Sequence, residues 1–295
     1  MSIDKVLGKI TEYPDQYDPE ILVKEDRQNN RDTVGINGND LPFVGFDTWN
    51  AYEISGLTVN GFPVAGIAKI VYPCDSKYIV ESKSIKLYFN SFNMDTFGHT
   101  PGEVLSNVAE TAASDLSELL ETKVSVVIHP ASVDIATQPV FSDTEFSTLE
   151  KVYGNELSNQ VFNTYKETPE LLKSGKDTGT FKYHSALLKS NCKVTSQPDW
   201  GDVYITMTGS KLPTPQSILE YIISFRDECH FHEEICETMY YRLWKNFDGM
   251  KELCVTCLYA RRGGIDINPT RASDAALLPM SLINPLELHT KTTKQ

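Results

Sequence analysis

An internal repeat is the feature that most constrains how this 295-residue chain can fold. Six residues recur 133 positions later, where chance would give about one match: Ser84, Ile85, Tyr88, Ser91, Phe92 and His99 correspond to Ser217, Ile218, Tyr221, Ser224, Phe225 and His232. Such self-similarity indicates a module that occurs twice in the chain. We therefore expect two domains of similar architecture, residues 1–150 and residues 151–295.

The repeat also resolves an ambiguous periodicity. The stretch 84–92 fits both the apolar face of a helix and the alternation of a strand. In the second copy, however, Thr214 and Pro215 form a typical helix start, a hydroxyl N-cap followed by proline in the first turn. Both copies are therefore predicted to be helices.

Each half is expected to run strand, strand, helix, helix, strand. The predicted strands include 63–73, 123–128, 181–188, 202–208 and 253–261, and the helices are 84–92, 102–120, 215–226 and 230–247. Residues 1–45 are polar and turn-rich, which predicts an irregular lead-in. Residues 131–180 are predicted to connect the halves with some structure of their own.

Charge and hydropathy exclude several partners. The formal net charge is −13 at pH 7, which disfavours nucleic acid, because its binding depends on neutralising phosphates. No run of 18 apolar residues occurs, and residues 1–10 are too polar for a signal peptide. The six scattered cysteines are typical of reduced thiols. We expect a soluble cytoplasmic protein with no membrane partner.

The stretch LLKSNCKVTSQPDWG, residues 187–201, carries the most prominent chemical signal. It presents Cys192 in a polar setting and, seven residues later, Asp199 between a proline and a tryptophan. A thiol and a carboxylic acid on one loop could serve as nucleophile and proton donor. The alternative is structural, because an isolated cysteine is more often an inert core side chain.

The two copies differ at the positions that could carry this chemistry. At a spacing of 135 residues, Leu57 and Val64 stand where the second copy has Cys192 and Asp199. Conversely, at a spacing of 133, the second copy has a threonine where the first has Glu81. Packing alone does not require such complementary differences. We therefore expect one composite site at the interface of the two halves.

Other polar residues keep alternative interpretations. Glu81 near a helix start could merely favour the helix dipole, and His232 and Glu233 could be ordinary first-turn residues. A zinc site is a second alternative, with the donors Cys229, His230, His232 and Cys236.

Four motifs occur in order along the chain: ESKSIKLYF (81–89), SNCKVTSQPDWG (190–201), SFRDECHFHEE (224–234) and ARRGGIDINP (260–269). Together they resemble the NADPH-dependent cyano-deazaguanine reductases (QueF family) of queuosine biosynthesis, in their long two-module form. The likeness covers most of the chain from Leu41 onward. It implies an α+β fold of two tandem tunnelling-fold (T-fold) modules, each ββααββ-like, with antiparallel sheets and helices on one face. It also implies a homodimer or larger assembly.

The resemblance further implies a reaction in queuosine tRNA modification. The nitrile of 7-cyano-7-deazaguanine would be reduced to an aminomethyl group with NADPH as cofactor, through a covalent thioimide on Cys192. Asp199 would give a proton to the nitrile nitrogen, with Trp200 closing over it, and His232 would assist proton transfer. A zinc-dependent hydrolase similar to GTP cyclohydrolase and a non-catalytic purine-binding T-fold module are the alternative functions.

The same resemblance assigns the binding residues. Substrate would contact Val80, Glu81, Ser82, His232 and Glu233, and NADPH would contact Ser82, Lys83, Arg262 and Gly263. No metal ligand is implied.

Overall fold

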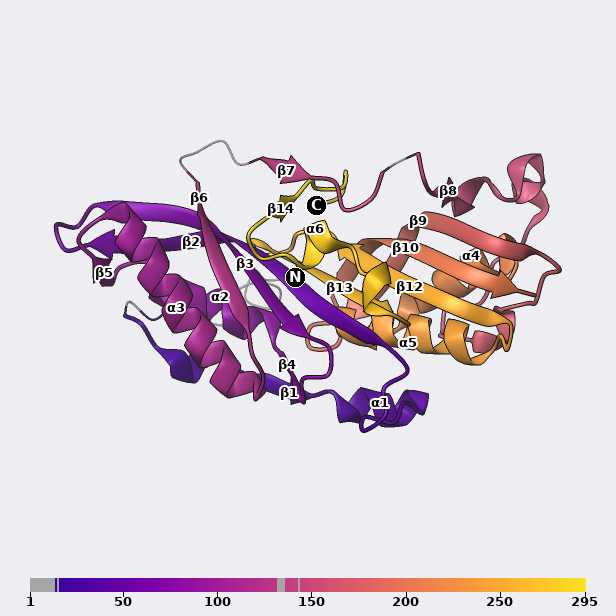
Figure 1. Ribbon diagram of the computed structural model, residues 1–295, viewed down its shortest axis with the longest axis horizontal. Helices are drawn as coiled ribbons and strands as arrows, with labels where there is room; N and C mark the ends of the chain where they lie inside the picture. The colour runs from indigo at the N-terminus through magenta and orange to yellow at the C-terminus, as the bar shows by residue number, and fades with distance from the viewer. Residues whose placement is uncertain (1–13, 15, 132–135, 143) are drawn as a thin grey trace, which may run out of the picture.

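The computed structural model describes residues 14, 16–131, 136–142 and 144–295, and most of them belong to one large sheet and the helices packed on it (Figure 1). The strands are β1 (Lys24–Asp26), β2 (Val44–Thr58), β3 (Pro63–Pro73), β4 (Tyr78–Val80), β5 (Thr96–Gly98), β6 (Ser125–Pro130), β7 (Thr137–Gln138), β8 (Ser147–Thr148), β9 (Thr178–Cys192), β10 (Pro198–Ser210), β11 (Cys229–His230), β12 (Met250–Tyr259), β13 (Ile265–Ala272) and β14 (Leu288–His289). The α-helices are α1 (Gln28–Val34), α2 (Ser82–Ser91), α3 (Pro101–Leu120), α4 (Pro215–Ser224), α5 (His232–Lys245) and α6 (Met280–Ile283).

The large sheet runs without interruption through both halves of the chain. Its strand order is β11-β9-β10-β12-β13-β2-β3-β6, with β5 added to β2 and β8 added to β9. The two halves join where β13 pairs antiparallel with β2, from Ile265 opposite Ala51 to Ala272 opposite Val44. Figure 1 shows this junction at the middle of the molecule. Because one sheet spans both halves, the division into two domains at residue 150 stays a prediction.

The same order of elements occurs in both halves. β2, β3, α2, α3 and β6 follow one another in the first half, and β9, β10, α4, α5 and β12 in the second. The predicted helices over 84–92 and 215–226 are confirmed, with Thr214 accepting a hydrogen bond from Ser217 as the N-cap of α4. The second helices begin at Pro101 and His232, so their spacing is 131 rather than 133 residues.

A further part of the repeat lies in segments whose similarity the sequence analysis did not detect. Asp18–Leu22 reads DPEIL and Thr168–Leu172 reads TPELL, and each forms a short 3₁₀ helix, η2 (Pro19–Ile21) or η5 (Pro169–Leu171). The residue after each motif accepts a backbone hydrogen bond from the N-cap of the first long helix in the same half, Glu81 N to Val23 O and Thr214 N to Lys173 O. The prediction of an irregular lead-in over residues 1–45 is therefore wrong for Pro19–Val34, which also contains β1 and α1. The prediction for residues 1–13 lies outside the described residues.

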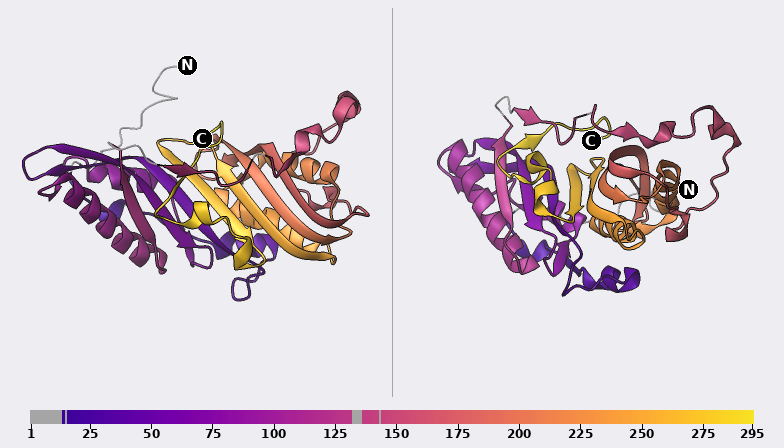
Figure 2. Two further views of the ribbon diagram at one scale, coloured as in Figure 1. Left: turned by 45° about the horizontal axis from the view of Figure 1, so that its top comes forward. Right: turned by 45° about the vertical axis from the view of Figure 1, so that its right-hand side comes forward.

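The helices α2 to α5 lie on one face of the sheet (Figure 2). Ile267 and Arg271 of β13 lie four residues apart, so their side chains point to the same face of the sheet. Ile267 packs in the same apolar cluster as α2 and α3, and Arg271 contacts Glu237 of α5. The opposite face is polar at the junction, where Asp266 accepts hydrogen bonds from Asn50 and Tyr52. Among the described residues, no helix is long and apolar enough to cross a membrane.

Two further elements differ from the sequence-based expectation. The segment around Cys192 is a β-hairpin rather than a loop, because β9 and β10 extend to Cys192 and from Pro198. Gly263 and Gly264 both have positive φ, which allows the tight turn between β12 and β13. The strand β13, which follows this turn, was not predicted from the residue pattern.

Candidate active site

The β9–β10 hairpin places Cys192 and Asp199 on the same side of the sheet. Asp199 pairs with Ser190 across the hairpin, and Cys192 lies two residues beyond Ser190, so the period of two directs both side chains the same way. Cys192 donates its backbone N–H to the carbonyl of Gln197 at 2.8 Å, which closes the hairpin. Both side chains are buried, with 6% and 5% of their surface exposed.

The expectation that Trp200 closes over Asp199 is wrong. Adjacent residues of a strand point to opposite faces, so the indole of Trp200 lies on the other side of β10. Trp200 is 40% exposed, and its ring contacts the guanidinium of Arg226. The residues that contact the carboxylate of Asp199 are instead His232 and Arg262.

Asp199 lies between an arginine and a histidine. Its Oδ1 is 2.7 Å from Nη1 of Arg262, in the β12–β13 turn, and its Oδ2 is 3.3 Å from Nε2 of His232, at the start of α5. The imidazole stacks on the ring of Tyr259 with a centroid distance of 3.8 Å, which fixes its orientation. A proton can therefore pass between His232 and Asp199 without a large movement of either side chain.

The Cys192 thiol is prepared for ionisation. Burial raises its pKa, but hydrogen bonds from the side chain and backbone of Thr195, and a further one from Arg262, outweigh burial and lower the pKa to about 7. Lys83 Nζ also lies 3.8 Å from the sulfur. Near neutral pH a substantial fraction of Cys192 is therefore thiolate, the nucleophilic form.

Glu233, the second residue of α5, is buried with 1% of its surface exposed. Its Oε1 has no hydrogen-bond partner among the described residues. Burial and, next, the charge of Asp47 raise the pKa of Glu233 to about 8. A buried carboxyl oxygen without a partner beside a cavity is suited to receive a ligand's N–H group.

The N-terminus of α2, in the first half of the chain, lies beside Cys192. Glu81 caps this helix, because its Oε2 accepts hydrogen bonds from the backbone N–H groups of Lys83 and Ser84 at 2.9 and 2.8 Å. Lys83 Nζ connects the halves, since it lies 3.5 Å from Oε1 of Glu81 as well as near Cys192.

One narrow cavity brings together six of the predicted residues. Its lining consists of Trp49, Ser82, Cys192, Asp199, His230, Phe231, His232, Glu233, Arg262 and Ile267. Of the other predicted residues, Lys83 contacts Cys192, Glu81 contacts Lys83, and Val80 is buried in the core of the first half. Gly263 lines a neighbouring cavity between α2 and β2.

Sequence reasoning missed several residues of the lining. Trp49 and Ile267 belong to β2 and β13 and reach the cavity only because these strands pair across the two halves, with Ile267 opposite Trp49. Phe231 was not singled out either, although it lies inside a recognised motif. Thr195, whose hydrogen bonds lower the Cys192 pKa, had no signal beyond its position in the hairpin turn.

The zinc alternative lacks a convergent set of donors. Cys236 points into the core, where its sulfur lies 3.5 Å from the carbonyl of Val255 and 3.6 Å from that of Pro269. His230 is occupied by Glu234 and Glu228 at 3.2 and 3.3 Å. Within the described part of the chain, no group of three or more His, Cys, Asp or Glu side chains could hold a metal ion.

The sequence also matches known proteins. Residues 13–128 match the family described as "Nitrile reductase, 7-cyano-7-deazaguanine-reductase N-term", and residues 198–276 match the family described as "QueF-like protein". A Coxiella burnetii protein named NADPH-dependent 7-cyano-7-deazaguanine reductase is 38% identical over 271 residues, or 91% of each chain. Proteins of the same name from Legionella pneumophila and Acidovorax ebreus are 37% and 38% identical and cover 91% and 94% of this chain, and 89% and 95% of their own lengths. This chain belongs to the family of NADPH-dependent 7-cyano-7-deazaguanine reductases.

Proposed function

We propose that this protein reduces the nitrile of 7-cyano-7-deazaguanine to an aminomethyl group, with NADPH as the reductant. The observation that carries the proposal is the convergence of a thiol of lowered pKa, Cys192, and the Asp199–His232 pair on one cavity that also contains Glu233. A nitrile is a poor hydride acceptor, and a covalent intermediate divides its reduction into easier steps.

Cys192 is the nucleophile in this proposal. Its thiolate adds to the nitrile carbon, so a C–S bond forms, one C–N π bond breaks, and the nitrogen takes up a proton to give a thioimide. The carbon then accepts hydride, the C–S bond breaks to release the thiolate, and the resulting imine is reduced to the amine. A pKa of about 7 supports this role, because about half of the thiol is ionised at neutral pH and the thiolate remains a good nucleophile.

Asp199 and His232 supply the protons. The carboxyl group of Asp199 accepts a proton from His232 over the 3.3 Å contact and donates it to the nitrogen as the C–S bond forms. Arg262 holds the other oxygen at 2.7 Å and so fixes the direction of the carboxyl group. His232 then takes up a proton from solvent and donates it in the second reduction.

Glu233 and the segment Val80–Ser82 hold the deazaguanine ring. Adjacent N–H groups of a guanine-like edge can donate to a carboxylate through charge-assisted hydrogen bonds. The unpartnered Oε1 of Glu233 supports this assignment directly. Glu81 contributes its Oε1, since its Oε2 is occupied by capping α2.

The residues predicted for NADPH have the chemistry that this cofactor needs. Lys83 and Arg262 are partly exposed cations, with 44% and 34% of their side-chain surfaces accessible, and Ser82 begins α2, whose N-terminus favours phosphate. Gly263, at φ +60°, permits close approach by a ligand. When bound, NADPH supplies hydride, and these residues would hold its charged groups.

Architecture and assembly complete the proposal. The repeated order of strands and helices supports two tandem T-fold modules, with the second extended to ββααββ by β13. We expect a homodimer or larger assembly in the cytoplasm, acting on the free base without direct contact with nucleic acid.

The direct test measures oxidation of NADPH. Protein mixed with 7-cyano-7-deazaguanine and NADPH should lower the nicotinamide absorbance with a stoichiometry of two NADPH per base. No oxidation above the rate without base would contradict the proposed reaction. A purine-binding module without activity would bind the base but leave NADPH unchanged.

A further inference from the structure

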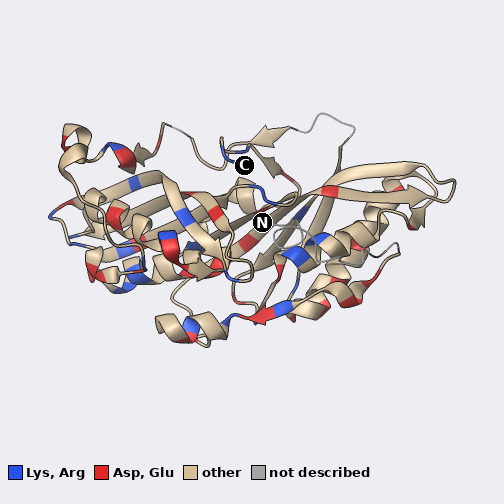
Figure 3. Ribbon diagram, turned by 180° about the vertical axis from the view of Figure 1, so that it is seen from behind, with Lys and Arg blue, Asp and Glu red and all other residues tan. Residues whose placement is uncertain are grey.

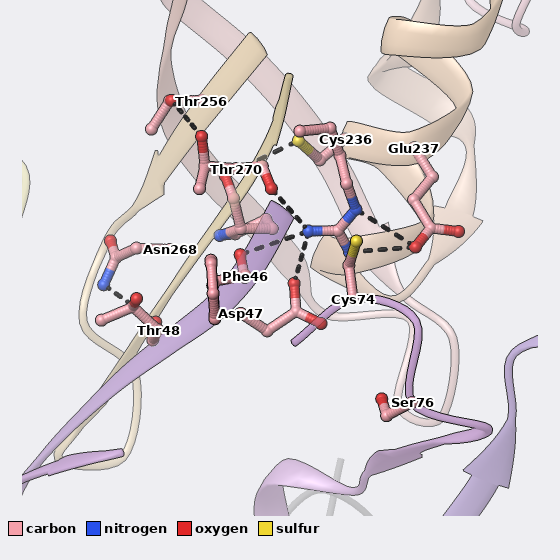
Figure 4. A network of polar contacts seen from close by, with 12 residues as sticks. Phe46, Asp47, Thr48, Cys74, Ser76, Cys236, Glu237, Thr256, Asn268 and Thr270 are labelled. Carbon is pink, nitrogen blue, oxygen red and sulfur yellow. Dashed lines mark hydrogen bonds and ion pairs between the residues drawn. The ribbon is translucent and has the colours of Figure 1, made fainter. Parts of the chain in front are cut away.

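A buried network of arginines and carboxylates connects β2, β13, α1 and α5. Figure 4 shows the part of it around Asp47 and Glu237. Asp47 of β2 contacts Arg27 at 2.5 Å and Arg271 at 2.8 Å. Glu237 of α5 contacts Arg31 at 2.8 Å, Arg271 at 3.0 Å and Arg27 at 3.5 Å. All five side chains are at most 4% exposed.

The network joins the lead-in to the helix that carries Glu233. Arg27 is the N-cap of α1 and Arg31 lies within this helix, in a segment for which the sequence predicted irregular structure. Their partner Glu237 lies four residues after Glu233, which is one turn along the same face of α5. The charges of the network therefore lie close behind the carboxyl group that faces the cavity.

The network carries one unbalanced positive charge. It contains three guanidinium groups but only two carboxylates, and burial raises the pKa of the adjacent Cys74 thiol to about 12, so that this thiol is neutral. An unbalanced charge is costly in a buried environment. An ionised Glu233 would balance the network.

Glu233 is subject to opposing influences from every element packed around it. Burial and the carboxylate of Asp47 raise its pKa, and Arg27 and Arg271 lower it. Two buried phenols also face it, Tyr72 of β3 and Tyr259 of β12, and both remain neutral because burial raises their pKa values. His232 precedes Glu233 on α5 and is directed at Asp199. Burial is thus the largest influence on the pKa of Glu233, and Asp47, Arg27 and Arg271 are the charged groups of the network that act on it.

We propose that this network is a positioning device, in which Arg27, Arg31 and Arg271 balanced against Asp47 and Glu237 set the ionisation of Glu233 and thereby the affinity for the substrate base. The inference rests on the proposed role of Glu233 in holding that base. Because the base donates N–H groups to an ionised carboxylate, affinity should rise with pH until Glu233 is fully ionised.

Three variants test the proposal, one that removes a cation and two that each remove an anion. Binding of 7-deazaguanine, which lacks the nitrile and cannot form an adduct, is measured by calorimetry from pH 6 to pH 9.5. Arg31→Met removes a cation and should move the midpoint of the affinity profile upward by about one pH unit. Glu237→Gln removes an anion and should move it downward by a similar amount, and Asp47→Asn should do the same.

Matched controls separate charge from structure. Arg31→Lys keeps the charge but loses the two-point contact with Glu237, so its midpoint should equal that of the unmodified protein. The double variant Arg31→Met/Glu237→Met removes one charge of each sign and should also leave the midpoint unchanged, since apolar replacement of a buried pair is generally tolerated. Circular dichroism establishes which variants fold. If one of the anion-removing variants Glu237→Gln and Asp47→Asn does not fold, the other provides the same test.

The possible outcomes are distinct. Shifts of opposite sign support the proposal, whereas shifts of the same sign, or equal midpoints in folded variants, overturn it while leaving the binding site intact. Absence of 7-deazaguanine binding to the unmodified protein at every pH would instead contradict the proposed function itself.

Discussion

The two long hairpins of the sheet have closely similar surroundings but different side chains. In β2–β3, Leu57 lies where β2 pairs in parallel with the short strand β5, and in β9–β10, Cys192 lies where β9 pairs in parallel with β11. Val64 and Asp199, near the starts of β3 and β10, are both buried, with 8% and 5% exposed. The backbone frame is therefore common to both halves.

The side chains that lie opposite the two hairpins differ. Asp199 meets Arg262 and His232, whereas Val64 packs in the apolar core of the first half. The helix starts differ in the complementary way, because Glu81 and Lys83 begin α2 beside Cys192, while Thr214 begins α4 with an uncharged cap. One half thus provides the thiol and acid, and the other provides the helix end that faces them.

The largest effect is expected for Cys192→Ala, with Leu57→Ala as the matched control. Loss of the nucleophile should lower kcat by roughly 10³-fold or more, because no other thiol lines the cavity within the described part of the chain. The equivalent position of the first half should tolerate Leu57→Ala with activity within about 2-fold of the unmodified enzyme. Steady-state NADPH oxidation measures both. Comparable losses in the two folded variants would refute the assignment of the chemistry to one hairpin.

Asp199→Asn should have the next largest effect. An amide cannot donate the proton in the same way, so kcat is expected to fall by roughly 10²-fold or more, while the thiol remains able to react with iodoacetamide. Val64→Ala is the control from the first hairpin. Unchanged turnover in Asp199→Asn would exclude it as the proton donor.

Glu233→Gln should weaken binding but stabilise the folded protein at alkaline pH. The folded-state pKa of about 8 exceeds the ordinary value of 4.5, so burial of Glu233 costs stability progressively as pH rises from about 4.5 to 8. The variant should therefore match the unmodified protein near pH 5 and exceed its Tm at pH 8.5 by roughly 2 °C or more. Affinity for 7-deazaguanine should fall roughly 10-fold. Calorimetry checks both, and a lower Tm than that of the unmodified protein at pH 8.5 would contradict the buried-carboxyl interpretation.

The smallest effect concerns the reactivity of the Cys192 thiol. Its alkylation by iodoacetamide should have a midpoint near pH 7, compared with about 8.5 for an ordinary thiol. Thr195→Val removes a hydrogen bond to the sulfur and should raise the midpoint by about half a unit. Mass spectrometry of the peptide containing Cys192 measures the rates. A midpoint near 8.5 in the unmodified protein would remove the argument for an activated thiol.

The sequence predicted those parts of the molecule that depend on local patterns. The repeated helices α2 and α4 followed from apolar spacing and the Thr214–Pro215 start, and the position of Cys192 and Asp199 at one cavity followed from one short segment. The burial of Trp49 at the cavity and the role of α1 could not be predicted, because both depend on pairing between segments more than 200 residues apart, such as Arg31 and Glu237. The predicted position of Trp200 was wrong because Asp199 and Trp200 are adjacent residues of a strand, not of a loop, and therefore point to opposite faces.

The covalent intermediate is the central claim, and intact-protein mass spectrometry tests it most directly. Protein incubated with 7-cyano-7-deazaguanine in the absence of NADPH should gain the mass of one base per chain, and the gain should vanish in Cys192→Ala and on addition of NADPH. An unmodified mass under conditions in which calorimetry shows the base bound, or an adduct that persists in Cys192→Ala, would contradict the mechanism.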